Sequence, residues 1–182
     1  MKIQLLLNLC IPIFFVFSLK AQVEISPSFL SKLEKAGVEF LAPLENSYRN
    51  LQVHDNSIQA YEFAIQHRKQ KVEIRYVVEA VPAKESNDIP HIFFANKAIN
   101  VAANTDDSVL SIHTMKTQQL QEEFNADWGA IAFFQPKKEF STKEHCKMVA
   151  IHAEGKGNVY IFYLFDDPQT DLEELFATLR FL

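Results

Sequence analysis

Cysteine is scarce in this chain of 182 residues, which contains only Cys10 and Cys146. Cys10 lies in an apolar segment at the N-terminus, so a chain that loses this segment keeps one cysteine and cannot form an internal disulfide. The sequence therefore excludes the disulfide framework that holds many small secreted domains together. It also excludes an exchange site built from two thiols.

Glycine is also scarce, with four residues at positions 37, 129, 155 and 157. These positions cannot form the glycine-rich loops that bind the phosphates of nucleotides and dinucleotides. The six histidines, at positions 54, 67, 91, 113, 145 and 152, never occur at a His-x-x-x-His spacing, and one cysteine cannot build a structural zinc site. The sequence predicts no cofactor and no metal site.

Long basic runs are absent, and the densest basic patch, Arg-Lys-Gln-Lys at residues 68–71, is typical of a solvated turn between strands. Residues 1–21 contain two lysines and no acid, so the rest of the chain has 18 − 2 = 16 basic and 23 acidic residues. With histidine neutral, its net charge is 16 − 23 = −7. This balance argues against nucleic acid as a partner, because phosphate binding requires clustered positive charge.

The first 21 residues have the pattern of a secretory signal peptide. Lys2 is followed by an apolar stretch at residues 5–19, and Ala21 is a small residue suited to cleavage. The alternative is an uncleaved membrane anchor, but this stretch is shorter than the roughly 20 residues that a spanning helix needs, and it contains Pro12. We therefore expect an exported protein, periplasmic or extracellular, with no stable membrane span after cleavage.

A short helix opens the rest of the chain, because Ser26 is a good N-cap, Pro27 suits the first helical position and Gly37 ends the apolar pattern. Extended segments follow, separated by turn residues. The predicted strands cover residues 38–41, 48–54, 59–68 and 71–81. Their close succession indicates antiparallel pairing.

Two helices are predicted next, at residues 90–104 and 114–124, followed by strands at residues 128–135, 146–153 and 159–165. The run at residues 159–165 is apolar without alternation, which indicates a central strand that is covered on both faces. Asp171 then caps a predicted closing helix with one apolar stripe. The stripe consists of Leu172, Leu175, Phe176, Leu179 and Leu182.

The order of elements is helix, four strands, two helices, three strands and helix. It predicts an α+β fold in which a mostly antiparallel sheet is covered by helices on both faces, a three-layer α/β/α sandwich. No repeat, low-complexity tract or composition change divides residues 22–182, so we expect a single domain.

This order, together with the motif Phe-Leu-Ala-Pro at residues 40–43, the late hairpin and the C-terminal helix, resembles the PsbP-like superfamily, in particular its uncharacterised exported bacterial branch. The resemblance implies an antiparallel sheet between helices. It also implies binding or accessory roles, mostly without catalysis. No shared catalytic motif exists to be carried over to this chain, and a fold alone does not fix a function.

Asp127 and Trp128 are the candidate binding residues. Trp128, the only tryptophan, would stack on a ligand in a cleft while Asp127 binds a hydroxyl group or a cation. The structural alternative is that Asp127 caps the chain between a helix and a strand, and that Trp128 buries a large apolar area. The sequence alone leaves both interpretations open.

Cys146 is the candidate nucleophile of the enzymatic alternative, a hydrolase or thiol enzyme. Its strand neighbours on the same face, Met148 and Ala150, favour an inert core thiol. His152 shares that face but lies about 20 Å away at 3.3 Å per residue, and His145 points to the opposite face, so neither histidine forms a dyad with the thiol. We assign no catalytic residue.

The function that the sequence favours is that of a small exported protein that binds a protein or a small molecule without catalysis. Two alternatives remain open: an enzyme that uses Cys146, and an accessory subunit tethered to the membrane by a retained N-terminal segment.

Overall fold

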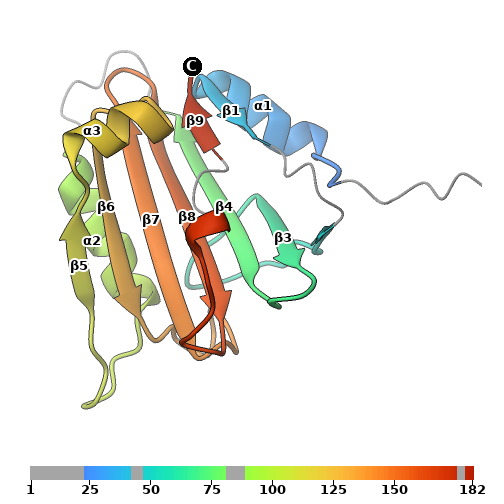
Figure 1. Ribbon diagram of the computed structural model, residues 1–182, viewed down its shortest axis with the longest axis vertical. Helices are drawn as coiled ribbons and strands as arrows, with labels where there is room; N and C mark the ends of the chain where they lie inside the picture. Colours follow the sequence, from blue (N-terminus) through green and yellow to red (C-terminus); the bar gives the residue numbers. More distant parts are fainter. Residues whose placement is uncertain (1–22, 42–46, 81–88, 176–178) are drawn as a thin grey trace, which may run out of the picture.

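The computed structural model describes residues 23–41, 47–80, 89–175 and 179–182, and it is built on a seven-stranded antiparallel sheet (Figure 1). The predicted signal segment, residues 1–21, lies outside the described residues. Across the sheet the strands are β2 (Tyr48–Asn50), β3 (Phe63–His67), β4 (Glu73–Ala80), β8 (Gly157–Phe165), β7 (His145–Ala153), β6 (Trp128–Phe134) and β5 (Ser111–Thr114). All six neighbouring pairs are antiparallel.

One face of the sheet packs against the N-terminal helix and a second, two-stranded sheet. Helix α1 (Pro27–Lys35) begins as the sequence predicts, with the Ser26 side chain accepting a hydrogen bond from the main-chain N–H of Phe29 at 3.3 Å. Its buried Phe29 stacks on Phe63 of β3, with ring centroids 4.8 Å apart. Beside it, β1 (Val38–Phe40) pairs with β9 (Leu179–Phe181) near the C-terminus (Figure 1).

The opposite face packs against helix α2 (Pro90–Val101), which buries Phe94, Ala98 and Val101. These side chains belong to a second core cluster that also contains Met148 and Phe162 of the sheet. Three short helical segments complete the described structure: α3 (Thr117–Gln119), a π-helical turn η1 (Leu120–Phe124) and a 3-10 turn η2 (Glu173–Leu175).

The prediction of a sheet covered by helices on both faces is wrong. The structure is mostly sheet. On the face that carries α1, the two-stranded sheet β1–β9, short turns and irregular segments provide much of the cover. The predicted closing helix is the source of the error, because residues 173–175 form η2 and residues 179–181 form β9, while Phe176 of the predicted stripe lies outside the described residues. Leu179 and Phe181 are buried with exposed Arg180 between them, a strand alternation that becomes favourable once β1 supplies a partner.

Strand β8 is buried along its whole length, as its continuous apolar run predicts. Ile161 and Tyr163 belong to the core cluster that contains α1, while Tyr160 and Phe162 belong to the cluster that contains α2. Both faces of a central strand are thus covered, although only one of the two layers is built mainly from a helix.

Candidate functional site

Asp127 immediately precedes β6 and joins this strand to the turn between β7 and β8. Its main-chain N–H donates to the carbonyl of His152 at 2.8 Å, and its carboxylate Oδ2 accepts from the main-chain N–H of Glu154, also at 2.8 Å. The carboxylate therefore satisfies a main-chain donor of the turn, which is a capping role.

Trp128 begins β6 and is half-buried on the face that carries α2. Its ring meets the ring of Phe94 edge to face, with centroids 5.8 Å apart. Among the described residues, neither Trp128 nor Asp127 lines either of the two cavities described below. Their contacts match the structural interpretation, and a ligand role for the pair remains a prediction.

Cys146 lies in β7 on the same face as Met148 and Ala150 and is only 1 % exposed. Burial raises the pKa of its thiol well above the ordinary value of 9.0, and the nearby Arg75 only partly offsets this effect. A reactive cysteine needs access and thiolate character. The geometry gives Cys146 neither property.

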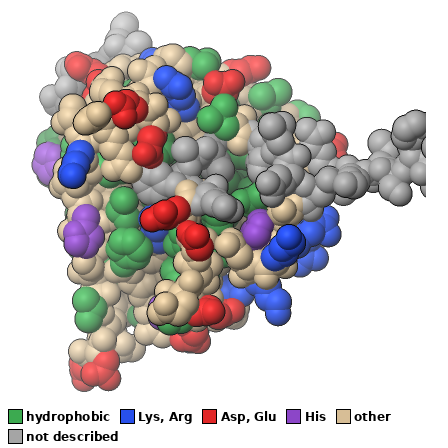
Figure 2. Space-filling view, in the orientation of Figure 1, with side chains coloured by type: hydrophobic (Ala, Val, Ile, Leu, Met, Phe, Trp, Pro, Cys, Tyr) green, Lys and Arg blue, Asp and Glu red, His purple; other side chains and the backbone are tan. Residues whose placement is uncertain are grey.

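A cavity of about 630 Å³, which we call the β6–β7 groove, opens on the other face of these strands. Its volume is in the range of small-molecule sites. The described residues that line it are Asp107, Ser108, Val109, Ser111, Phe133, Phe134, Gln135, His145, Cys146, Lys147, Phe165, Pro168, Thr170, Leu172 and Glu173. Figure 2 shows hydrophobic side chains exposed between histidines and acidic side chains over this part of the molecule.

Lys147 is the central polar residue of the groove. The strand register places it between Phe133 of β6 and Tyr163 of β8, with Nζ 6.0 and 5.9 Å from the two ring centroids. It is only 9 % exposed. Burial lowers the pKa of its ammonium group from the ordinary 10.5, and the carboxylates of Glu173 and Glu123 partly offset this shift.

Aromatic rings form much of the groove on either side of this lysine. Phe133 is 41 % exposed and has the ring of His113 on β5 at 6.3 Å. Phe165 packs against the ring of His145 at 5.5 Å. The groove therefore combines exposed apolar surface with one buried cation, and the imidazoles lie against the rings at its sides.

One wall of the groove is the segment that follows β8, and hydrogen bonds of Asp166 and Asp171 hold it in place. Asp166 Oδ2 accepts from Lys143 Nζ at 2.7 Å, which ties the end of β8 to the start of β7. This bond lowers the pKa of the Asp166 carboxyl group below its ordinary 3.8. Asp171 accepts from the main-chain N–H of Glu173 at 2.9 Å, so it caps the 3-10 turn η2.

Sequence reasoning missed this groove, although one signal was available. Lys147 lies within an apolar strand, between Cys146 and Met148. Lysine is almost never buried without a partner or a role, so its presence there marks a special environment. The other lining residues come from segments far apart in the chain, and no sequence pattern connects them.

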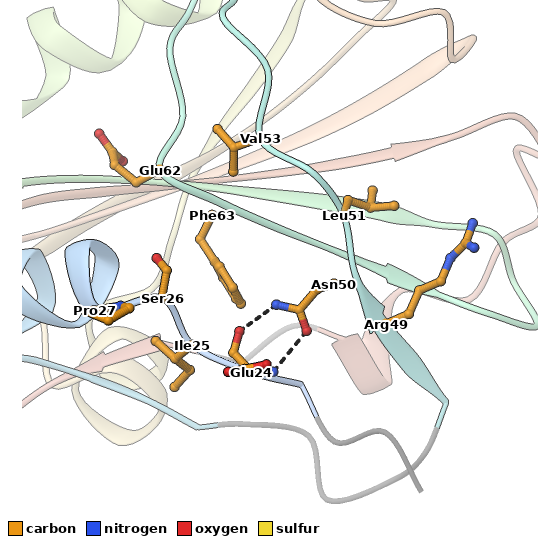
Figure 3. A pocket seen from close by; sticks show the side chains of 10 residues that line it. All are labelled: Glu24, Ile25, Ser26, Pro27, Arg49, Asn50, Leu51, Val53, Glu62 and Phe63. Carbon is orange, nitrogen blue, oxygen red and sulfur yellow. Dashed lines mark hydrogen bonds between the residues drawn. The ribbon is translucent and has the colours of Figure 1, made fainter.

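A second cavity, of about 550 Å³, lies beside the N-terminal segment (Figure 3). There the Asn50 side chain binds the main chain of Glu24 twice: it accepts from the N–H at 2.9 Å and donates to the carbonyl at 2.5 Å. These polar groups satisfy one another and fasten Glu24 to Asn50 of β2. This cavity is therefore explained by chain packing better than by ligand binding.

The described residues contain no group of three or more His, Cys, Asp or Glu side chains that could hold a metal ion. No helix among them is long and apolar enough to cross a membrane. Comparison with known proteins found no matching family model, no matching curated protein and no matching solved structure. The resemblance to the PsbP-like superfamily therefore stays a prediction.

Proposed function

We propose that this chain is an exported, non-catalytic binding protein whose ligand site is the β6–β7 groove. The observation that carries the proposal is a nearly buried lysine between aromatic rings in a cavity of about 630 Å³. Sites for small molecules are commonly apolar concavities with a few polar groups that orient the ligand. Lys147 and the rings of Phe133 and Phe165 form such a combination.

The chemistry of the groove favours a small, mainly apolar ligand with an oxygen acceptor at one end. Exposed Phe133 offers the apolar part a surface whose burial removes unfavourable contact with water. An ammonium group donates hydrogen bonds and accepts none, so Lys147 favours a carboxylate, sulfonate, carbonyl or hydroxyl oxygen. Lys147 is only 9 % exposed, and the partial exclusion of water around it strengthens such a charged hydrogen bond.

The enzymatic alternative has no comparable support. Cys146 contributes to the lining of the groove, but it is buried and its thiol has a raised pKa. A nucleophilic cysteine is activated by a lowered pKa or an adjacent base. His152 lies six positions further along the same strand, where it pairs with Asn158, its Nδ1 3.1 Å from the amide oxygen.

The test uses 8-anilinonaphthalene-1-sulfonate, a fluorescent probe that has both aromatic rings and a sulfonate acceptor. The fluorescence titration should show one site per chain. Phe133→Ser removes the exposed ring, and Lys147→Met removes the charge while keeping the length of the side chain. We expect each to weaken binding about tenfold, which corresponds to about 1.4 kcal/mol.

Leu30→Ser is the matched control, because Leu30 is a large exposed hydrophobic residue on α1, away from the groove. It should leave the affinity unchanged. Thermal melting by circular dichroism establishes that each variant folds, and Phe133→Ser should fold because Phe133 is already 41 % exposed. If the probe does not bind, or if it binds equally to the native chain and both groove variants, the proposal is wrong.

Export is the second part of the proposal, and it rests on the signal-like pattern of residues 1–21. Intact mass spectrometry of the protein recovered from the cell envelope and from the medium tests it. A mass that lacks about 21 residues supports cleavage and export. A full-length mass in the membrane fraction would favour the tethered alternative.

A further inference from the structure

Strand β5 lies at the edge of the seven-stranded sheet, where β6 is its one partner among the residues that the structure describes (Figure 1). The main-chain N–H of Met115 donates to the carbonyl of Gly129, which follows the same register. Because main-chain groups alternate along an antiparallel strand, Ile112 and Thr114 direct their N–H and C=O groups outward. Such an edge is a template for another strand.

Helix α2 adds exposed apolar side chains on the face of the sheet to which Ile112 also belongs. Lys97 of α2 reaches toward β4, where it bonds to Glu79, and Asn100 donates to the carbonyl of Ile58 in the segment before β3. At 100° per residue, Ile92 and Ile99 lie on the side of the helix turned away from these contacts. Both are exposed, as Ile112 is.

Several devices that proteins use to protect an edge strand are missing from β5. Its four residues, Ser-Ile-His-Thr, include no lysine, no acid and no proline. Opposite charges flank it instead. Asp106 and Asp107 come before the strand and Lys116 comes after it, and all three are exposed. A chain that runs antiparallel to β5 with the same sequence would bring its Lys116 toward these acids.

We infer that β5 pairs antiparallel with β5 of a second copy of this chain, which joins the two seven-stranded sheets into one. The two-fold axis of this dimer runs perpendicular to the sheet, so both copies of α2 lie on the same face, and Ile92 and Ile99 contribute apolar surface there. Antiparallel pairing places Lys116 of each copy near Asp106 and Asp107 of the other. Parallel pairing would instead bring the acids of both copies together.

The arrangement also places both β6–β7 grooves on one face of the joined sheet. Ser111 of β5 lines the groove, so each groove lies next to the pairing edge. The inference does not depend on the proposed ligand, because it rests on the edge, the apolar surface and the flanking charges. A failed probe titration would leave it standing.

Sedimentation equilibrium of the purified protein tests the dimer. The native chain should have twice the mass of its Ile112→Lys variant at the same concentration. The substitution sets two lysines beside each other at the joined strands, and we expect it to raise the dimer dissociation constant about tenfold or more. Leu30→Lys is the matched control, because Leu30 is 47 % exposed and Ile112 is 46 % exposed. It should remain dimeric.

A charge-swap series tests the antiparallel register. Lys116→Glu should weaken the dimer, and combining it with Asp106→Lys and Asp107→Lys should restore association because the opposite charges are re-formed. Raising the salt concentration should weaken the native dimer, since these groups are exposed. A native chain that stays monomeric at every concentration overturns the inference. So does a dimer whose mass Ile112→Lys leaves unchanged.

Discussion

Arg75 holds two loops against the sheet, and its replacement should unfold the protein at a markedly lower temperature. It is buried in β4, on the face that carries α2. Nε donates to the Glu73 carboxylate and Nη1 to the carbonyl of Phe140, both at 2.6 Å. The guanidinium carbon lies 4.6 Å from the centroid of the Tyr61 ring and 4.7 Å from that of Phe140. The charge is thus held between two aromatic rings.

The size of the effect follows from these four contacts. Removing one partner of a buried ion pair costs about 3–5 kcal/mol. Each cation–π contact contributes about 0.5–2 kcal/mol. Because Glu73 keeps some contact with solvent, we expect Arg75→Ala to lower the free energy of unfolding by about 3 kcal/mol. For a chain of this size, about 2–4 °C per kcal/mol converts this to a loss of about 6–12 °C in Tm.

Urea denaturation followed by circular dichroism measures the loss in free energy of unfolding. Arg75→Lys tests whether this loss comes from the charge alone or also from the planar guanidinium group. Lysine keeps the charge but cannot stack as a planar group or donate from two nitrogens of a fixed fork. We expect it to recover less than half of the stability. Arg49→Ala, which removes an exposed arginine bonded to Gln66, should change stability by less than about 0.5 kcal/mol. An Arg75→Lys variant as stable as the native chain would refute the reasoning.

Three further predictions follow from single contacts. Cys146 should not react with a thiol reagent at pH 8 in the native state and should react at once in denaturant, since burial raises the pKa of its thiol; fast native-state labelling would contradict this. Gly157→Ala should prevent stable folding, because Gly157 has φ +143° and an added Cβ would lie 2.1 Å from a main-chain oxygen of β4. Gly155 has φ +71° and open space around it, so Gly155→Ala should lower the free energy of unfolding by only about 1 kcal/mol. Urea denaturation of both variants tests this difference. Asp127→Ala should lower the free energy of unfolding by about 1 kcal/mol, because it removes the acceptor for the N–H of Glu154. Asp127→Asn keeps an acceptor oxygen and should recover most of this loss. Equal melting temperatures for the two variants would argue against the capping role.

Local signals in the sequence were sufficient for several elements. Ser26, Pro27 and Gly37 marked the beginning and end of α1, because caps and helix-breaking residues act within a few positions of themselves. The predicted strands at residues 146–153 and 159–165, with the continuous apolar run of the second, located the β7–β8 hairpin and its buried second strand. These elements are determined mainly by residues close to them in the sequence and little by contacts with distant residues.

Other elements could not be inferred from local signals. The C-terminal residues satisfy a helical apolar stripe as well as a strand alternation, and pairing of β9 with β1 decides between the two. Strand β5 (Ser111–Thr114) was not predicted, and its pairing with β6 adds a strand just before the predicted helix at 114–124, whose residues 117–124 form α3 and η1. In each case a partner from a distant part of the chain outweighs local propensity.

The candidate site shows the same division. Asp127 and Trp128 stand out in the sequence because they are adjacent and chemically distinctive, yet the structure gives them contacts with different elements. Lys147 and Phe133 are not adjacent, and only the register of β6 against β7 brings them together in the groove.

The sequence by itself determined the scarcity of thiols and glycines, the acidic balance, and the positions of α1, α2 and the central strands. The tertiary structure decided which face each apolar side chain covers, that the C-terminus adds a strand, and that a lysine and exposed aromatic rings meet in one cavity. The physical reason is the distance along the chain over which each kind of interaction acts. Caps, turns and hydrophobic periodicity act between near neighbours, whereas strand pairing and cavities join residues that are far apart in the chain.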